Sequence, residues 1–122
     1  MNTKDIGTAG EKAACKYLKK NGYRILECNY QRAAGKIIGE IDIIAKKDNV
    51  ISFVEVKTRK SEEFGLPCEF VTKSKQQRLI KTAYTYIMEH NLDECYSFDV
   101  IEVLHNGNKV TLVRHIPNAF TE

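Results

Sequence analysis

The feature that most constrains this chain is a pair of short apolar segments that alternate with charged residues around a turn. The first segment runs from Glu40 to Lys46 and the second from Val50 to Thr58, with Asp48-Asn49 between them. Aspartate and asparagine tolerate the left-handed backbone conformation that a tight connection requires. The two segments therefore predict a β-hairpin with a two-residue turn.

The turn also predicts the register of this hairpin. With Asp48-Asn49 in the loop, Lys47 pairs with Val50, and further pairs follow outward along both strands. Asp42 then lies directly opposite Glu55. Side chains at such opposed positions are close neighbours on one face of the sheet.

Side chains alternate between the two faces of a strand, which separates the charged residues from the apolar ones. Glu40 and Asp42 share one face of the first strand, and Glu55 and Lys57 share one face of the second. The register places Lys57 opposite Glu40, where the two could form an ordinary cross-strand salt bridge on a solvated sheet face. The other face is expected to be the core and carries only apolar residues: Ile41, Ile43, Ala45, Val54 and Val56.

The opposed carboxylates of Asp42 and Glu55 predict a metal site. Like charges placed directly opposite each other are destabilising, and a cation between their oxygens removes that repulsion. Mg²⁺ takes oxygen ligands, usually one or two protein carboxylates together with water and phosphate. A bound metal polarises a phosphoryl oxygen and activates a water, and Lys57 is placed to orient that water or to neutralise charge on phosphorus. The pattern indicates hydrolysis of a phosphodiester with Mg²⁺ or Mn²⁺ as cofactor.

The rest of the chain predicts one mixed α/β domain over residues 1–122, with the element order α-β-β-β-α-β-β. The hairpin above supplies the second and third strands, and Asn106-Gly107 is a strong signal for a second two-residue turn. That turn would pair Asp99 with Arg114 as a structural contact. The remaining elements are expected at residues 8–20 (helix), 23–30 (strand), 74–90 (helix), 97–104 (strand) and 109–116 (strand).

Glu11 adds a third carboxylate to the candidate site. On the first helix it falls in line with Ala14, Cys15 and Leu18, so it borders the buried stripe. A carboxylate at that edge is able to approach the metal or to orient a water. A first-turn glutamate that complements the helix dipole explains the same residue, and the sequence leaves both interpretations open.

Cations gather at the start of the second predicted helix, where they oppose its dipole. These cations could bind the phosphates of a nucleic-acid backbone, because phosphate contacts dominate the affinity of proteins for nucleic acids. A solvated lysine-rich face is the alternative, and the net charge of +3 permits a polyanionic partner without requiring one. The candidate contacts are Arg32, Arg59, Lys73, Lys75 and Arg78.

These motifs resemble the YraN-like family, small bacterial proteins predicted to have the restriction-endonuclease or Holliday-junction-resolvase fold of the PD-(D/E)xK superfamily. The resemblance covers nearly the whole chain. Its motifs are Gly10-Glu11, Gly39-Glu40-Ile41-Asp42, Phe53-Val54-Glu55-Val56-Lys57-Thr58-Arg59, Phe98-Asp99-Val100 and His115-Ile116-Pro117-Asn118-Ala119-Phe120.

The resemblance implies a central mixed sheet flanked by helices and an endonuclease that cleaves DNA, including branched or structured DNA. The implied metal ligands are Asp42, Glu55 and the carbonyl of Val56, with Lys57 as catalytic lysine and Glu11 as the helix-one glutamate. Resolvases generally act as dimers, so a homodimer is also implied, although the sequence carries no interface signal. The chain departs from the pattern in two places, with Ile41 where a proline is common and Ser97 where an arginine is expected.

Other function classes remain open from the sequence. A nucleic-acid-binding module without turnover, or an accessory protein that binds another protein, could keep the same fold. The four cysteines form no CxxC knuckle, and the start lacks the apolar stretch of a signal peptide. No apolar run approaches the roughly 20 residues that span a membrane. We therefore expect a cytoplasmic protein with free thiols and no membrane partner.

Overall fold

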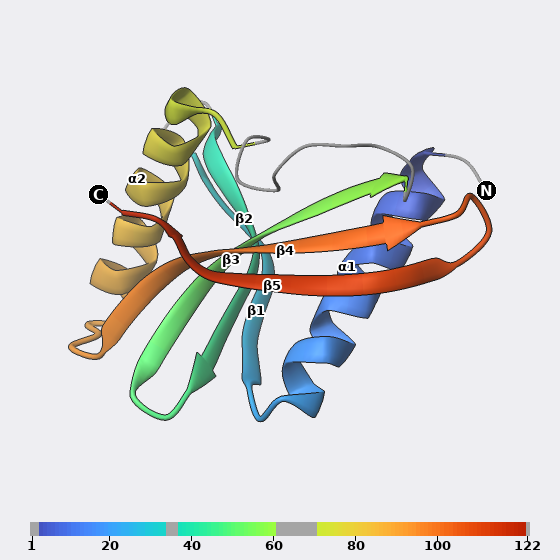
Figure 1. Cartoon of the computed structure of the whole chain (residues 1–122). Helices are drawn as coiled ribbons and strands as arrows, with labels where there is room; N and C mark the ends of the chain where they lie inside the picture. The colour runs from blue at the N-terminus through green and yellow to red at the C-terminus, as the bar shows by residue number, and fades with distance from the viewer. Residues whose placement is uncertain (1–2, 34–36, 61–70, 122) are drawn as a thin grey trace.

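A computed structural model describes residues 3–33, 37–60 and 71–121, with side chains described for 6–32, 39–60 and 71–121. In this part of the chain five strands form one sheet, and a helix lies on each side of it (Figure 1). The elements are α1 (Thr3–Lys20), β1 (Arg24–Ala33), β2 (Ile37–Lys47), β3 (Val50–Lys60), α2 (Lys73–Glu89), β4 (Cys95–His105) and β5 (Val110–Phe120).

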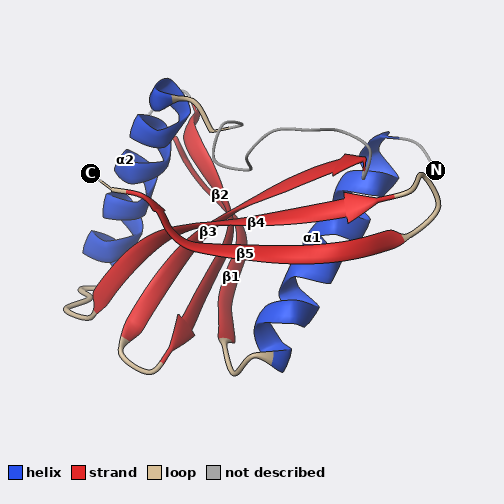
Figure 2. Cartoon of the chain, viewed as in Figure 1, coloured by secondary structure: helices blue, strands red, loops and turns tan. Residues whose placement is uncertain are grey.

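The sheet has the order β1-β2-β3-β4-β5, and each strand lies beside its neighbour in the sequence. β3 and β4 are parallel and are joined by a connection that contains α2, whereas the other three pairs are antiparallel. Figure 2 shows that the sheet is strongly twisted, with β1 and β5 running in clearly different directions. The predicted α/β order is confirmed, and so is the mixed sheet flanked by helices.

The turn between β2 and β3 has the predicted two residues. Lys47 pairs with Val50, and Asp48 has a left-handed φ of +55°. The ladder then runs as predicted for five pairs and ends at Ile43–Val54. The register is therefore confirmed up to the last pair before the candidate acidic residues.

β2 and β3 part beyond that pair, so the predicted direct opposition of Asp42 and Glu55 does not occur as a ladder pair. The Asp42 carboxylate accepts a hydrogen bond from the Val56 N–H at 2.8 Å, so a side chain occupies the place of a ladder bond. Further along β2, Glu40 pairs with Gln31 of β1 and accepts a hydrogen bond from its amide at 3.1 Å. The predicted opposition of Glu40 and Lys57 is wrong, because β2 follows β1 there and leaves β3.

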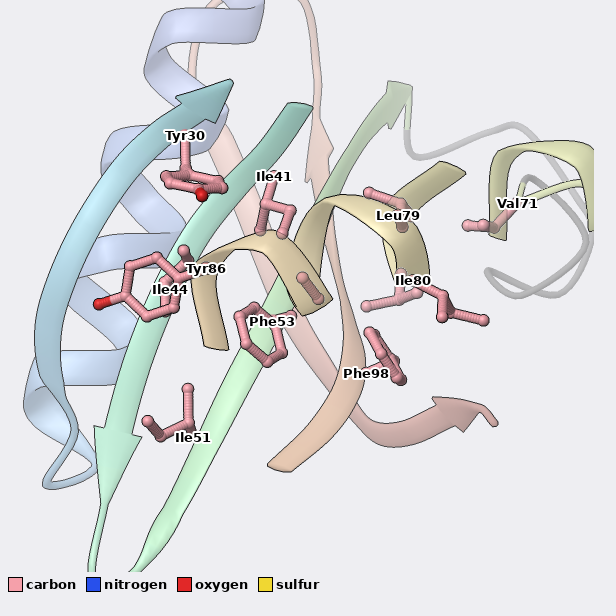
Figure 3. Close-up of a cluster of buried hydrophobic side chains, with 12 residues drawn as sticks. Tyr30, Ile41, Ile44, Ile51, Phe53, Val71, Leu79, Ile80, Tyr86 and Phe98 are labelled. Atoms are coloured by element: carbon pink, nitrogen blue, oxygen red, sulfur yellow. The ribbon is translucent and has the colours of Figure 1, made fainter. Parts of the chain in front are cut away.

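Both faces of the sheet are buried. The face expected to be core is confirmed for Ile43, Ala45, Val54 and Val56, whereas Ile41 packs on the opposite face. Side chains of α1 pack on one face and those of α2 on the other. Figure 3 shows the cluster packed against α2, which we call the α2 cluster. Ile44 and Phe53 contribute to it from the face expected to be charged. The α1 cluster comprises Ala14, Leu18, Ile43, Ala45, Val54, Val56, Ile101 and Val103.

The direction of the β2 side chains changes at Asp42. Ile43 packs in the α1 cluster, whereas Ile41, two residues away, packs in the α2 cluster. On β1, Asn29 has a φ of +53° and lies between the partners of these two isoleucines. A left-handed residue within a strand sharpens the local twist. This twist explains why the β2 residues on either side of Asp42 pack on opposite faces of the sheet.

The last hairpin differs from its prediction. Asn106 accepts hydrogen bonds from the N–H groups of Asn108 and Lys109, which closes a four-residue loop at 106–109 in place of a two-residue turn. The register therefore shifts, and Arg114 pairs with Glu102. The predicted contact between Asp99 and Arg114 is wrong. In the described part of the chain, no helix is long and apolar enough to cross a membrane.

Helix α2 approaches β2 tightly at Gly39, beside the candidate site. A Cβ there would lie 2.6 Å from Thr82 Oγ1 and 3.2 Å from the Arg78 carbonyl oxygen of α2. Thr82 is fully buried and donates its own hydrogen bond to Arg78 O, so it cannot easily move aside. Only glycine fits this contact without displacing α2.

Gly39→Ala is therefore expected to lower the free energy of unfolding by roughly 1–3 kcal/mol through overpacking. The matched control is Gly7→Ala in α1, where a Cβ would meet nothing within 4 Å. That change is expected to be neutral or stabilising by up to about 1 kcal/mol, because alanine suits a helix better than glycine. Urea denaturation of both variants measures the difference, and equal effects would show that the contact at Gly39 is not tight.

Candidate functional site

The predicted acidic residues lie beside the gap that opens where β2 leaves β3. Asp42 and Glu55 are the first positions beyond the last ladder pair, one on each strand. Both line a pocket of about 330 Å³ together with residues of α2. The remaining described lining residues are Gly39, Glu40, Lys75, Arg78 and Leu79.

Glu55 is buried and depends on lysines for its countercharge. Only 6% of the residue is exposed. Its Oε1 lies 2.7 Å from Nζ of Lys75 on α2 and 3.9 Å from Nζ of Lys57 on its own strand. A buried carboxylate without a partner would be strongly destabilising, so these two ammonium groups account for its place in the fold.

Asp42 carries the clearest electrostatic signal in the site. Burial, followed by the negative charge of Glu55, raises the pKa of its carboxyl to about 7. The hydrogen bond from the Val56 N–H works in the other direction, while Glu11 and Glu40 raise the pKa further. A neighbouring cation would favour the ionised form of this carboxyl and lower its pKa.

Glu11 approaches the same group from α1. Burial and the charge of Glu40 raise its pKa, a side-chain hydrogen bond with Asn29 lowers it, and Glu55 raises it again. Four carboxyl groups from three elements thus influence one another across the gap. The structure brings Glu11 to the acidic pair, as expected from its place beside the buried stripe, and its chemical role stays a prediction.

Lys57 and Lys75 share the positive side of the site. Burial lowers the pKa of Lys57, and so does the neighbouring Lys75, against the opposite pull of Glu55 and Asp42. Burial also works against the charge on Lys75, but its hydrogen bond with Glu55 raises that pKa overall. Lys75 was predicted as a nucleic-acid contact, and its direct bond to Glu55 of β3 could not be predicted without knowing how α2 packs on the sheet.

The donor atoms of this site suit a hard divalent cation, because carboxylate oxygens are the ligands that Mg²⁺ and Mn²⁺ take. Within the described residues, however, no three Asp, Glu, His or Cys groups stand ready to hold a metal ion. Lys75 instead supplies the positive charge beside Glu55. A metal between Asp42 and Glu55 would take over that role, and the carbonyl of Val56 stays a predicted further ligand.

The remaining predicted nucleic-acid contacts differ in their partners. Arg78 lines the pocket and Lys73 is exposed on the first turn of α2. Arg32 pairs in the sheet with Gly39 of the pocket lining, but its guanidinium lies 2.7 Å from Glu89 and over the Tyr30 ring. Arg59 bonds a different carboxylate, that of Glu102.

The Arg59 contact is part of a buried ion cluster. Glu102 is fully buried, and its second oxygen lies 3.2 Å from Arg114 on β5. The Arg59 side chain is itself only 10% exposed. Arg59 therefore neutralises a carboxylate inside the fold. Neither this cluster nor the pairing of Asp99 with His115 at 2.8 Å was found from the sequence. The Arg59–Glu102 contact depends on the parallel pairing of β3 with β4, and the contacts of Arg114 and His115 depend on the shifted register of β5.

With the site described, the chain can be compared with known proteins. Residues 10–103 match the model of "Uncharacterised protein family UPF0102". The chain belongs to the UPF0102 family. The matched span contains Glu11, Glu40, Asp42 and Glu55, so all four carboxyl groups of the site lie within it.

Relatives within UPF0102 match this chain over almost its whole length. A UPF0102 protein of Caldanaerobacter subterraneus subsp. tengcongensis is 50% identical, and the match covers 98% of both chains. UPF0102 proteins of Caldicellulosiruptor saccharolyticus and Clostridioides difficile are 44% and 46% identical, with 98% of this chain and 100% of each relative covered. The resemblance to the YraN-like family is confirmed at this level. The family description assigns no reaction, so the chemistry rests on the site.

The raised pKa of Asp42 predicts a pH-dependent change in stability. A carboxyl whose pKa rises from 3.8 to about 7 on folding costs stability as the pH rises between those values, because the unfolded chain ionises first. Asp42→Asn cannot ionise but keeps an oxygen that accepts the Val56 N–H. Relative to wild type, this variant should therefore gain stability progressively as the pH rises from about 4 to about 7.

Urea denaturation across this pH range, with a metal chelator present, measures that gain. Asp93→Asn is the control, since Asp93 is exposed and lies outside the pocket lining. A gain for Asp42→Asn that does not vary with pH would mean that burial and Glu55 do not perturb this carboxyl.

Proposed function

We propose that this protein is a metal-dependent endonuclease of the PD-(D/E)xK superfamily that hydrolyses phosphodiester bonds in DNA, including branched or structured DNA. The observation that carries the proposal is the Asp42–Glu55 pair. Both carboxyl groups lie beside one gap between strands, and each favours a nearby positive charge. A nuclease site needs such a pair to hold its metal.

Each residue of the site has its own role in the proposed reaction. Asp42 and Glu55 would hold Mg²⁺ or Mn²⁺ through their oxygens, with the Val56 carbonyl as a further ligand. The bound cation supplies the charge that polarises a phosphoryl oxygen and lowers the pKa of a water. Lys57 orients the attacking water or neutralises the charge that grows on phosphorus. Glu11, across the gap, holds the water from the other side.

Lys75 and Arg78 extend the proposal to the substrate. If Glu55 held a metal ion, the Lys75 ammonium would no longer be needed in its 2.7 Å ion pair. It is then available, with Arg78 on the same pocket wall, to contact the phosphate that is cleaved. Lys73 would contact a neighbouring phosphate. By analogy with resolvases we also propose a homodimer, acting on nucleic acid in the cytoplasm.

Replacing a metal ligand tests the proposal directly. Glu55→Gln removes the negative charge but keeps the side-chain volume. We expect it to slow metal-dependent cleavage at least about 100-fold, because the charge stabilisation that a metal supplies is worth several kcal/mol. The assay uses junction, single-stranded and duplex DNA with Mg²⁺ or Mn²⁺.

The matched control is Glu94→Gln, which removes a carboxylate from an ion pair with Lys46 outside the pocket. Its cleavage rate should equal that of wild type. Circular dichroism of both variants checks that they fold. If no substrate is cleaved in a metal-dependent way that Glu55→Gln abolishes, the nuclease proposal fails.

A second candidate function is a nucleic-acid-binding module that does not turn over its substrate. The Lys75–Glu55 ion pair favours it, because the fold already supplies the cation that Glu55 requires. Binding that weakens steeply with salt, yet is unchanged by Asp42→Asn and occurs without cleavage, would select this alternative.

A further inference from the structure

Asp42 also lines a second cavity, on the side of the strands that faces α1. This cavity of about 480 Å³ lies between α1 and the first two strands. We call it the α1 groove. Its lining includes three lysines, two cysteines and an aspartate: Lys12, Lys16, Lys19, Cys15, Cys28 and Asp42. None of the three lysines was singled out from the sequence, and no role proposed above uses them.

The floor of the α1 groove is apolar. The thiols of Cys15 and Cys28 lie 3.9 Å apart, one from α1 and one from β1. Ile43 also lines the cavity, and its side chain is fully buried. Burial and then the neighbouring Cys28 raise the pKa of Cys15 to about 11, so this thiol is uncharged at neutral pH.

The rim of the α1 groove is basic. Lys12, Lys16 and Lys19 are exposed and follow one another at helical spacing along the same face of α1. In the described part of the chain none of the three forms a salt bridge, whereas Arg32, Arg59 and Lys75 all do. Like charges at this spacing weaken a helix, so the row gains from an anion that the fold itself does not supply.

We propose that the α1 groove binds single-stranded nucleic acid that leads to Asp42. Lys12, Lys16 and Lys19 contact successive phosphates, and the bases lie over the thiol floor. Lys12 and Lys19 are about 10 Å apart along the helix axis, which is the length of about three nucleotides in a stacked strand. This inference rests on the proposed nuclease function, because it supplies the strand on which Asp42 and Glu55 act.

A single strand fits this groove better than a duplex. In a duplex the bases are paired inside the helix, so the apolar floor between the lysines would stay unfilled. Unpaired bases expose flat apolar faces that can pack on the thiol floor, while the lysine row follows the backbone. Proteins that bind single strands likewise use a positively charged groove that tracks the backbone. Asp42 lines both the α1 groove and the pocket beside α2, so a strand in the groove would lie next to the proposed catalytic pocket.

The salt dependence of binding tests the lysine row. The test variant combines Lys12→Gln, Lys16→Gln and Lys19→Gln. The control combines Lys20→Gln, Lys47→Gln and Lys109→Gln, which changes the net charge equally at exposed lysines outside the groove lining. Binding of a labelled oligothymidylate is measured by anisotropy over a range of salt, without divalent metal. The slope of log K against log salt should become shallower by about 2 in the test variant, at about 0.7 per lost phosphate contact.

Cysteine alkylation locates the strand in the wild-type protein. Cys28 and Cys95 are both exposed. Cys28 lines the groove, whereas Cys95 lies outside it at the start of β4. Oligothymidylate should slow the reaction of Cys28 with N-ethylmaleimide in proportion to the fraction of protein bound. The reaction of Cys95, measured in the same sample by peptide mass spectrometry, should keep its rate.

Each outcome bears on the inference. If the oligonucleotide binds while the test and control variants keep the same slope, or while Cys28 is not protected, the groove assignment is overturned. The nuclease proposal would still stand if Glu55→Gln abolished cleavage. If lysine-dependent binding is seen with duplex but not with the single strand, the assignment to single strands is wrong. If no nucleic acid binds at any salt concentration, both the groove and the nuclease proposals fail.

Discussion

The separation of β2 from β3 beyond the Ile43–Val54 pair is the constraint on which the rest of this structure depends. Had the ladder continued, Asp42 and Glu55 would be two like charges on a flat sheet surface. Instead, the Asp42 carboxylate accepts a hydrogen bond from the Val56 N–H. It lies where the β2 side chains change from one face of the sheet to the other. Two pockets meet at this residue, one under α2 and one under α1. A single local departure from regular pairing thus creates both the buried acidic pair and the access to it.

Burial gives this acidic pair its chemistry. In water both carboxyl groups would ionise well below neutral pH and interact weakly. Within the fold, desolvation and mutual repulsion hold the pKa of Asp42 near 7, while Glu55 is buried only because Lys75 and Lys57 neutralise it. A positive charge near Asp42 would therefore stabilise its ionised form. Glu55 already has such a charge, which Lys75 of α2 supplies. Displacement of that lysine by a metal is the step that would convert a stable ion pair into a catalytic site.

The sequence predicted the parts of the fold that depend on local pattern. The two-residue turn at Asp48-Asn49 determined the hairpin register, and the element order followed from the spacing of apolar residues. It could not predict features that depend on how distant elements meet. The left-handed conformation of Asn29, the docking of Lys75 onto Glu55 and the four-residue loop that shifts β5 all require tertiary contacts or loop geometry. For the same reason Arg59, which looks like a surface contact in the sequence, is a partner of the buried Glu102.

The central claim is that Asp42 and Glu55 share a divalent cation, and a crystal soaked in Mn²⁺ tests it most directly. Anomalous scattering locates manganese without reference to the protein model, and the surrounding oxygens identify the ligands. The account predicts one ion bound by oxygens of both carboxylates, with the Lys75 ammonium moved away from Glu55. An ion bound elsewhere, or no ion while Lys75 remains paired with Glu55, would contradict it.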